Sequence, residues 1–272
     1  MQPRSATAND VNDLLAGHCP SSALHLQCNS RGSVELLIRP CDREGSPITP
    51  YSFVKLAEAI GAGCEVDLWV ADRAKPIVSA LRSDGFAGSV AINLSQSTLL
   101  APQRLLDVLR EPMQLEITED TRVDGSNAEL RLKQFAIEAL QAGHTLSLDD
   151  LIGAHQGVER WELLRDAVVE IKIDLGSSRD LEGKPEAQGE TWLKSLSAAE
   201  LDAVSQAIAG SLNIVIERGG TPLSDRIAAI LVARGAHAER IARQDFDIHR
   251  PEPLHAFVDR VRRDGMPSCA SR

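Results

Sequence analysis

The 272-residue sequence has no long apolar run, no paired cysteines and no excess of basic residues. No stretch reaches the roughly 18 apolar residues that a membrane span needs, and the first 20 residues lack the continuous apolar segment of a signal peptide. The five cysteines are scattered without a CxxC pair, which argues against a disulfide framework or a zinc site. We therefore expect reduced thiols, a cytoplasmic location and no membrane partner.

The formal net charge of −10 argues against non-specific binding to DNA or RNA, because such binding needs a basic surface. An anionic small ligand stays compatible, since a few local cations or metal ions reverse the local field. No GxGxxG or GxxxxGK[ST] loop follows an expected strand. Its absence weakens a nucleotide-binding open sheet.

Short apolar runs alternate with longer amphipathic segments. The expected strands are 24–28, 34–39, 89–94, 113–118, 145–149, 168–173, 212–217 and, more weakly, 239–243. The expected helices are 50–60, 65–81 with a kink at Pro76, 97–110, 126–142, 191–210, 222–234 and 253–263, with a polar loop at 175–190. This alternation predicts a parallel sheet with helical crossovers.

A closed TIM-like (β/α)8 barrel fits the strand count, and an open doubly wound α/β sheet is the alternative. We expect an N-terminal extension at 1–22, the barrel domain at 23–264 and a C-terminal tail at 265–272.

Charged residues interrupt these apolar strands. The first case is VELLIRP at 34–40, which carries Glu35 and Arg39 although burial of an unpaired charge is costly. Comparable residues lie in or just after the other strands: Asn93, Glu116, Glu119, Asp149, Asp150, Lys172 and Glu217. Any one of them alone is readily explained as a satisfied structural group. In a parallel barrel, however, they would converge at the carboxyl-end face.

Carboxylates brought that close would repel one another and shift each other's pKa values. A divalent cation removes this conflict, and carboxylate and amide oxygens suit Mg²⁺, Mn²⁺ or Ca²⁺ rather than zinc. Two such ions sharing a carboxylate form a clamp for in-line attack on a phosphodiester. The Asp149–Asp150 pair at a strand end suits the bridging position.

The ordered motifs match a known family. They are ELLIR at 35–39, INLS at 92–95, LEITED at 115–120, LDD at 148–150, IKID at 171–174, IVIERGG at 214–220 and QDFDIHRP at 244–251. From about residue 24 to residue 251 the chain resembles the EAL domain, the bacterial phosphodiesterases and receptors of cyclic di-GMP. The resemblance implies an EAL-type barrel that uses one or two Mg²⁺ or Mn²⁺ ions, with Ca²⁺ as a candidate inhibitor.

The resemblance also implies roles by position. The implied metal ligands are Glu35, Asn93, Glu116, Asp149 and Asp150, with Asp149 shared between two ions. Lys172, Glu217 and Asp150 would be catalytic, with Glu217 as general base or water orienter and Lys172 contacting the water or a phosphate oxygen. Arg39 and Gln244 would bind the substrate. Glu119 and Asp174 would support the site.

Two departures from the family pattern stand out. The short glycine-rich segment after the Asp pair is replaced by DDLIGAHQGVERWEL at 149–163, where only Gly153 stands roughly in place. The final glutamate of the family's EGVE is Gly220 in this chain. His155 is either an exposed loop residue or a new ligand or base, and Trp161 is either a packing anchor or a base-stacking residue.

Two functions therefore stay open. One is metal-dependent hydrolysis of cyclic di-GMP to linear pGpG, which the complete set of implied ligands favours. The other is a degenerate, non-catalytic domain that binds cyclic di-GMP or a protein, which the two departures favour. A homodimer or a regulatory protein is the expected macromolecular partner. A barrel without any ligand would require all the strand-end carboxylates to be solvated or paired among themselves.

Overall fold

The structure is a computed structural model that describes residues 3–18, 23–152, 156–175, 185–218, 221–244 and 251–264. Its strands form one curled sheet in the order β8-β7-β6-β5-β4-β3-β2-β1-β9. They are β1 Leu24–Cys28, β2 Val34–Ile38, β3 Val90–Leu94, β4 Gln114–Ile117, β5 Thr145–Leu148, β6 Val168–Asp174, β7 Asn213–Glu217, β8 Ile241–Gln244 and β9 Glu252–Pro253. Every strand predicted from the sequence is present, and β9 was not predicted.

The strands from β2 to β8 pair in parallel, as the sequence predicts. The first strand differs, because β1 runs antiparallel to β2. A parallel connection needs a dozen or more residues, whereas residues 29–33 alone separate these two strands. The turn is held by Asn29, whose side-chain oxygen accepts hydrogen bonds from the amides of Arg31 and Ser33.

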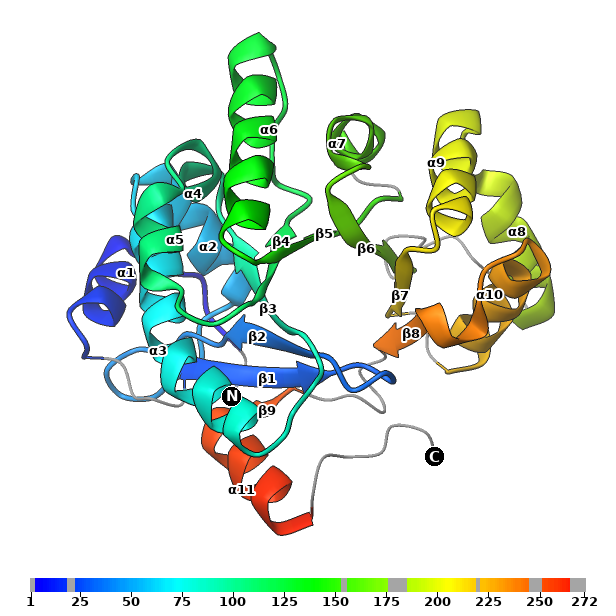
Figure 1. Cartoon of the computed structure of the whole chain (residues 1–272). Helices are drawn as coiled ribbons and strands as arrows, with labels where there is room; N and C mark the ends of the chain where they lie inside the picture. The colour runs from blue at the N-terminus through cyan, green and yellow to red at the C-terminus, as the bar shows by residue number, and fades with distance from the viewer. Residues whose placement is uncertain are drawn as a thin grey trace.

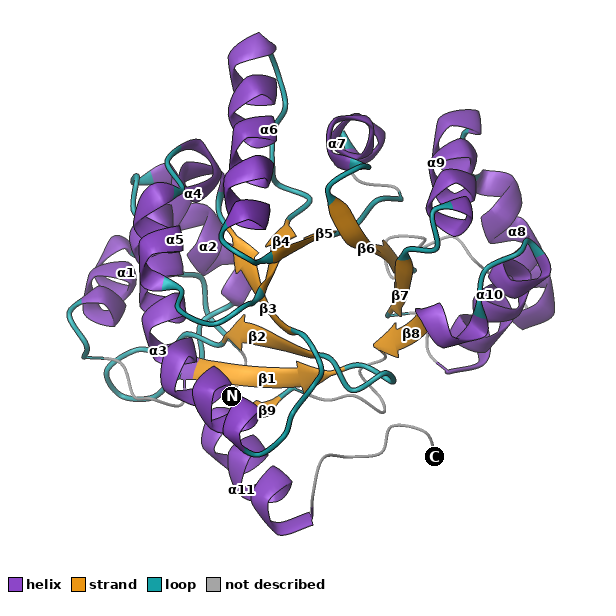
Figure 2. Cartoon of the chain, in the orientation of Figure 1, coloured by secondary structure: helices purple, strands orange, loops and turns teal. Residues whose placement is uncertain are grey.

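The sheet curls until β8 approaches the β1–β2 hairpin (Figure 1). Within the described ranges no strand ladder joins β8 to that hairpin. Two hydrogen bonds from backbone amides join β8 to the turn between β1 and β2 instead: the Ser30 amide donates to the Arg243 carbonyl at 2.9 Å, and the Arg243 amide donates to Ser30 Oγ at 2.9 Å. The helices surround the outside of the curled sheet (Figure 2). The predicted barrel-type architecture is therefore confirmed, and the doubly wound alternative, with helices on both faces, is wrong.

The helices are α1 Ala8–Leu15, α2 Pro50–Ala59, α3 Gly63–Ser83, α4 Gln96–Leu100, α5 Gln103–Val108, α6 Ser126–Gln141, α7 Gly157–Leu164, α8 Pro185–Ser195, α9 Ala198–Ala209, α10 Thr221–Ala233 and α11 Leu254–Asp264. A 3₁₀ turn at Ala238–Arg240 precedes β8. Helix α3 continues through Pro76. Helix α1, which the sequence analysis did not predict, places Val11 and Leu14 in the core.

Two predicted helices are each divided in two. The segment 97–110 breaks at Ala101, which takes φ −146° and ψ 64°. The residue before a proline is driven out of the helical region, and Pro102 follows. The segment 191–210 breaks before Ser197, which caps α9 through a reciprocal capping box with Glu200. The predicted loop 175–190 was also partly wrong, because α8 begins at Pro185.

The core lies between the sheet and the helices, while polar side chains fill the inside of the curl. Strand β6 illustrates the alternation, since Ile171 and Ile173 are fully buried beneath the helices. Lys172 lies between them on the opposite face and is 3% exposed. No helix in the described part of the chain is long and apolar enough to cross a membrane.

Candidate metal and phosphodiester site

The polar residues that interrupt the strands meet inside the curled sheet. Asn93 and Glu116 are paired in register on β3 and β4, and Asp174, Glu217 and Gln244 are in register on β6, β7 and β8. Asp149 follows β5 directly, and its amide donates to the Ile117 carbonyl at 2.9 Å. These positions lie at the carboxyl ends of their strands, as the sequence predicts.

Glu35 is the exception, because it is the second residue of β2 and lies in register with Ala91 rather than Asn93. Its side chain nevertheless reaches the same group. Asn93 Nδ2 donates to Glu35 Oε1 at 2.6 Å, and Gln244 Nε2 donates to Glu35 Oε2 at 2.8 Å. Glu35 therefore lies between the two ends of the strand series, and its carboxylate joins β3 to β8.

Lys172 is the centre of this cluster. Its ammonium lies 2.9 Å from Glu116 Oε2, 3.0 Å from Glu217 Oε1 and 3.1 Å from Glu35 Oε2. A fourth carboxylate oxygen, Asp149 Oδ1, is 3.8 Å away. The carboxylate in the VELLIRP strand is thus compensated, because Glu35 is paired with a buried lysine and two side-chain amides. Sequence reasoning placed Lys172 beside water or phosphate and missed its role as the counterion of four carboxylates.

A second acidic group lies beside this centre. Asp149, Asp150 and Glu217 each offer a carboxylate oxygen, and these oxygens lie within 4.8 Å of one another. The Oδ1 atoms of both aspartates are buried and have no hydrogen-bond donor among the residues that the structure describes. Hard divalent cations such as Mg²⁺ prefer oxygen ligands of this kind. The residues present therefore fit a divalent cation.

Burial and mutual repulsion shift the pKa values of these groups. Burial, opposed by Lys172 and reinforced by Asp149, raises the pKa of Glu217 to about 8. Burial, with the charge of Asp149, raises the pKa of Asp150 to about 7. Burial also raises the pKa of Glu116 well above its ordinary value. In the absence of another cation, the cluster therefore holds protons near neutral pH, which a bound divalent ion would displace.

Glu35 and Lys172 behave in the opposite sense. Burial favours the neutral form of Glu35, but Lys172 and the hydrogen bonds from Asn93 and Gln244 outweigh it and lower the pKa of Glu35. Burial likewise opposes the charge of Lys172, yet the surrounding carboxylates raise its pKa well above the ordinary value. The shifts therefore favour the charged forms of Glu35 and Lys172. They favour the protonated forms of Glu116 and Glu217.

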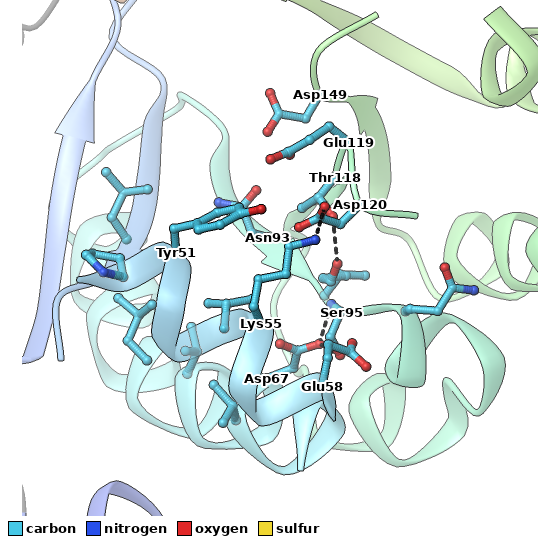
Figure 3. Close-up of a pocket in the computed structure, with 18 of the residues that line it drawn as sticks. Tyr51, Lys55, Glu58, Asp67, Asn93, Ser95, Thr118, Glu119, Asp120 and Asp149 are labelled. Atoms are coloured by element: carbon cyan, nitrogen blue, oxygen red, sulfur yellow. Dashed lines mark hydrogen bonds and ion pairs between the residues drawn. The ribbon is translucent and has the colours of Figure 1, made fainter. Parts of the chain in front are cut away.

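A cavity of about 820 Å³ opens beside the acidic group. Glu35, Asn93 and Asp149 form its polar side, and Ile38, Val54, Val66 and Val70 contribute apolar surface. Asp67 and Ser95 lie at another side of the same cavity, where the Ser95 hydroxyl donates to Asp67 Oδ2 at 2.7 Å (Figure 3). Burial raises the pKa of Asp67 to about 6. The cavity thus combines apolar surface with hydrogen-bonding groups, next to the candidate cation site.

Of the remaining predicted residues, Arg39 and Glu119 line this cavity, while Asp174 is not among the lining residues. Arg39 lines the cavity, and its Nη1 donates to the Ile38 carbonyl at 2.9 Å. Glu119 also lines it, and burial raises the pKa of Glu119. Asp174 is the last residue of β6, where it is 1% exposed and forms an ion pair with Arg218. Sequence reasoning missed Arg218, which lines the cavity immediately after Glu217.

The segment after the Asp pair is an anchored turn followed by helix α7. Leu151 and Ile152 are buried, and the Leu151 amide donates to the Lys172 carbonyl at 3.1 Å. Trp161 is 3% exposed and belongs to the core, which agrees with the packing role expected for it. Gly153, His155 and Gly220 lie outside the described residues, as does most of 244–251.

Arg160 is the residue of this segment that sequence reasoning missed. It is fully buried, although it carries a guanidinium. A signal was present, because Gly157, Arg160, Trp161 and Leu164 have the i, i+3, i+4, i+7 spacing of one helical face. An arginine on an otherwise apolar face indicates a buried partner for its charge.

Comparisons with known proteins found one curated relative and several similar solved structures. No family model matches the chain. A cyclic di-GMP phosphodiesterase of Pseudomonas aeruginosa is 27% identical over 168 residues, which cover 58% of this chain and 28% of that protein. The chain thus spans less than a third of that relative.

Solved structures match over almost the whole chain. The PaMucR phosphodiesterase in complex with c-di-GMP has a TM-score of 0.62 and 25% identity, covering 91% of this chain and 98% of that one. The FimX EAL domain from Pseudomonas aeruginosa bound to c-di-GMP has a TM-score of 0.62 and 17% identity, covering 89% and 94%. At that identity FimX supports the fold alone. The fold and site define a barrel with an acidic centre. In sequence and in fold the chain is similar to EAL domains and to cyclic di-GMP phosphodiesterases.

Proposed function

We propose that the chain hydrolyses cyclic di-GMP to linear pGpG in a reaction that depends on Mg²⁺ or Mn²⁺. The observation that carries this proposal is the convergence of Glu35, Glu116, Asp149, Asp150 and Glu217 beside a cavity of about 820 Å³. The volume lies within the 300–1,000 Å³ range of small-molecule sites. The family relation supports the choice of a cyclic dinucleotide as substrate.

The cation would be held by Asp149, Asp150 and Glu217, with Glu35, Asn93 and Glu116 on the adjoining side. When bound, such an ion supplies Lewis-acid polarisation of a phosphate oxygen and lowers the pKa of a bound water. One or two ions are compatible with the number of carboxylates. The same oxygen ligands accept Ca²⁺, which would compete for the site.

The protein residues then have separate tasks. Arg39 lines the cavity and binds a phosphate through its planar guanidinium. Glu217 accepts a proton from the attacking water, while Lys172 holds that carboxylate in place at 3.0 Å. The water oxygen bonds to phosphorus and the P–O3′ bond breaks. The departing 3′ oxygen takes up a proton from solvent, and Glu217 releases to solvent the proton that it accepted. Gln244 keeps Glu35 oriented through its 2.8 Å hydrogen bond.

The test is to incubate the purified chain with cyclic di-GMP and Mn²⁺ and to follow pGpG by chromatography. We expect turnover that Glu35→Ala and Glu35→Gln abolish. Glu65→Ala is the matched control, because Glu65 is a surface carboxylate paired with Arg104 and should leave turnover unchanged. Turnover that survives in both Glu35 variants would contradict the proposal.

A second candidate function is binding of cyclic di-GMP without turnover. The observation that favours it is Arg218, which lines the cavity beside Glu217 and pairs with buried Asp174. A guanidinium so close to the acidic group would hold a phosphate tightly, whether or not the bond is broken. Tight binding by the wild-type chain with no pGpG at saturating Mn²⁺ would identify a receptor and contradict the enzymatic proposal.

A further inference from the structure

Arg160 on helix α7 connects two strand ends that carry the acidic site. Its Nη1 donates to the Thr118 carbonyl at 2.9 Å, and its Nη2 donates to the carbonyls of Asp149 at 3.2 Å and Asp150 at 3.3 Å. Thr118 follows β4, which ends at Ile117, and the aspartates follow β5. One buried guanidinium therefore connects the residues that follow the carboxyl ends of two neighbouring strands.

These contacts begin where the strand ladder stops. The last bond between β4 and β5 runs from the Asp149 amide to the Ile117 carbonyl. Beyond this bond, Arg160 donates hydrogen bonds to the carbonyls of Thr118, Asp149 and Asp150, which lie past the last paired residues of β4 and β5. Because Asp149 and Asp150 are candidate cation ligands, the position of their backbone decides where their carboxylates lie.

The backbone at this point needs such a restraint. Asp150 has φ 46°, a left-handed conformation that residues other than glycine adopt at a cost. Strained conformations of this kind persist only where the surroundings hold them. Helix α7 also approaches closely, since a Cβ on Gly157 would lie 2.3 Å from the Leu151 carbonyl oxygen. The turn after the Asp pair is therefore fixed between α7, β4 and β6.

We propose that Arg160 is a positioning residue, which sets the geometry of Asp149 and Asp150 for the divalent cation without touching the cation or substrate. This inference rests on the proposed metal-dependent function of the same site. It assigns the support of the Asp pair to helix α7, most of which lies within the altered segment 149–163.

The guanidinium is suited to this task by its shape as well as its charge. Its flat fork of N–H groups reaches three carbonyls from two strands at once, which the single ammonium of lysine cannot reproduce. The surrounding charges are those of Asp149, Glu119, Asp150 and Asp120. A purely electrostatic role would make Arg160 a competitor of the cation, so its removal would strengthen cation binding. A positioning role predicts the reverse.

The test measures Mn²⁺ affinity by isothermal titration calorimetry in Arg160→Lys and Arg160→Met variants of the full chain. Loss of supporting contacts around a metal site commonly weakens affinity by about 10–100-fold, and we expect both variants to fall in that range. The matched controls are Arg165→Lys and Arg165→Met. Arg165 is exposed near the end of the same helix and contacts Gln206, so these variants should bind Mn²⁺ like the wild type.

The outcomes separate the possible roles. Unchanged affinity in Arg160→Lys with tighter binding in Arg160→Met would indicate charge alone and overturn the positioning role. A lowered melting temperature with wild-type Mn²⁺ affinity would indicate a merely structural role and overturn it as well. If Arg160→Met fails to fold, Arg160→Lys decides, because it keeps the charge and loses the fork.

The proposed function is tested separately by the wild-type chain. A wild type that binds Mn²⁺ but leaves cyclic di-GMP intact overturns the hydrolase proposal, while a weakened Arg160→Lys still supports positioning. A wild type that binds no Mn²⁺ overturns both.

Discussion

Replacement of Lys172 by methionine tests the electrostatics of the site most directly. Methionine keeps most of the length and volume of the side chain but removes the charge. In the folded protein that charge lies about 3 Å from oxygens of Glu35, Glu116 and Glu217. The lysine residue itself is only 3% exposed to solvent. The variant therefore leaves several buried carboxylates without their common counterion.

The magnitude follows from these distances. At 3 Å and an effective dielectric constant of about 20, each contact is worth about 5.5 kcal/mol before desolvation is subtracted. Desolvation of the ions cancels much of this, and loss of one partner from a buried ion pair typically costs about 3–5 kcal/mol. At about 2–4 °C per kcal/mol, the Lys172→Met melting temperature should fall by about 6–20 °C. The loss should be smaller at pH 6 than at pH 8.5, because protonated carboxyls need no counterion.

The assay is thermal unfolding in EDTA at both pH values, followed by circular dichroism, and then the same scan with Mn²⁺. Lys75→Met is the matched control, since Lys75 pairs only on the surface with Asp72 and should change the melting temperature little. We expect Mn²⁺ to restore part of the lost stability by supplying positive charge. A Lys172→Met variant that melts within about 2 °C of the wild type in EDTA at pH 8.5 would refute the reasoning.

Three further predictions concern pH, the ligand and the turn after the Asp pair. Because the folded-state pKa values of Glu217 (about 8) and Asp150 (about 7) lie above their unfolded values, the folded protein holds the extra protons. The metal-free chain should therefore lose stability as pH rises from about 5 to 8, as measured by its calorimetric melting temperature. Its Mn²⁺ affinity should rise over the same range. A melting temperature and an Mn²⁺ affinity that do not change with pH would contradict this prediction. Arg39→Met should weaken cyclic di-GMP binding by about tenfold or more with Mn²⁺ affinity intact, as measured by titration calorimetry; equal loss of both would indicate disruption of the site. Gly157→Ala places a Cβ against the Leu151 carbonyl oxygen and should lower the free energy of unfolding in urea by about 1–3 kcal/mol. An unchanged urea midpoint would show that helix α7 shifts to accept the methyl group without cost.

The strands were predictable because their apolar, β-branched runs are short and clearly bounded. Strand β6 is an example, since the residues Ile171 and Ile173 that flank Lys172 are both buried. The antiparallel pairing of β1 with β2 could also have been predicted from the sequence. The five residues between Cys28 and Val34 are too few for a parallel crossover. The length of this connection therefore decides the direction of β1, although the general alternation of strands and helices suggests a parallel sheet.

Helix α7 and Arg160 were harder to predict. The helix begins after Gln156, which takes a left-handed conformation with φ 59° and offers no Ser, Thr or Asp cap. The glycines of the segment suggested a loop, whereas Gly157 is required by the close approach of Leu151. The partners of Arg160 are backbone carbonyls at two strand ends. Such partners cannot be identified from the pattern of side chains in a sequence.

The altered segments therefore do not imply a weakened site by themselves. After the Asp pair, Asp150 holds a left-handed backbone and Arg160 binds its carbonyl. After Glu217, Arg218 holds another left-handed backbone with φ 56°, where the EGVE motif of the family has a glycine, and it pairs with buried Asp174. In both places a guanidinium contact accompanies a conformation that glycine would adopt without strain. In this chain a side-chain contact thus accompanies each of these two backbone conformations, and metal affinity measured in Arg160→Lys and Arg218→Gly will decide how much of the site depends on each.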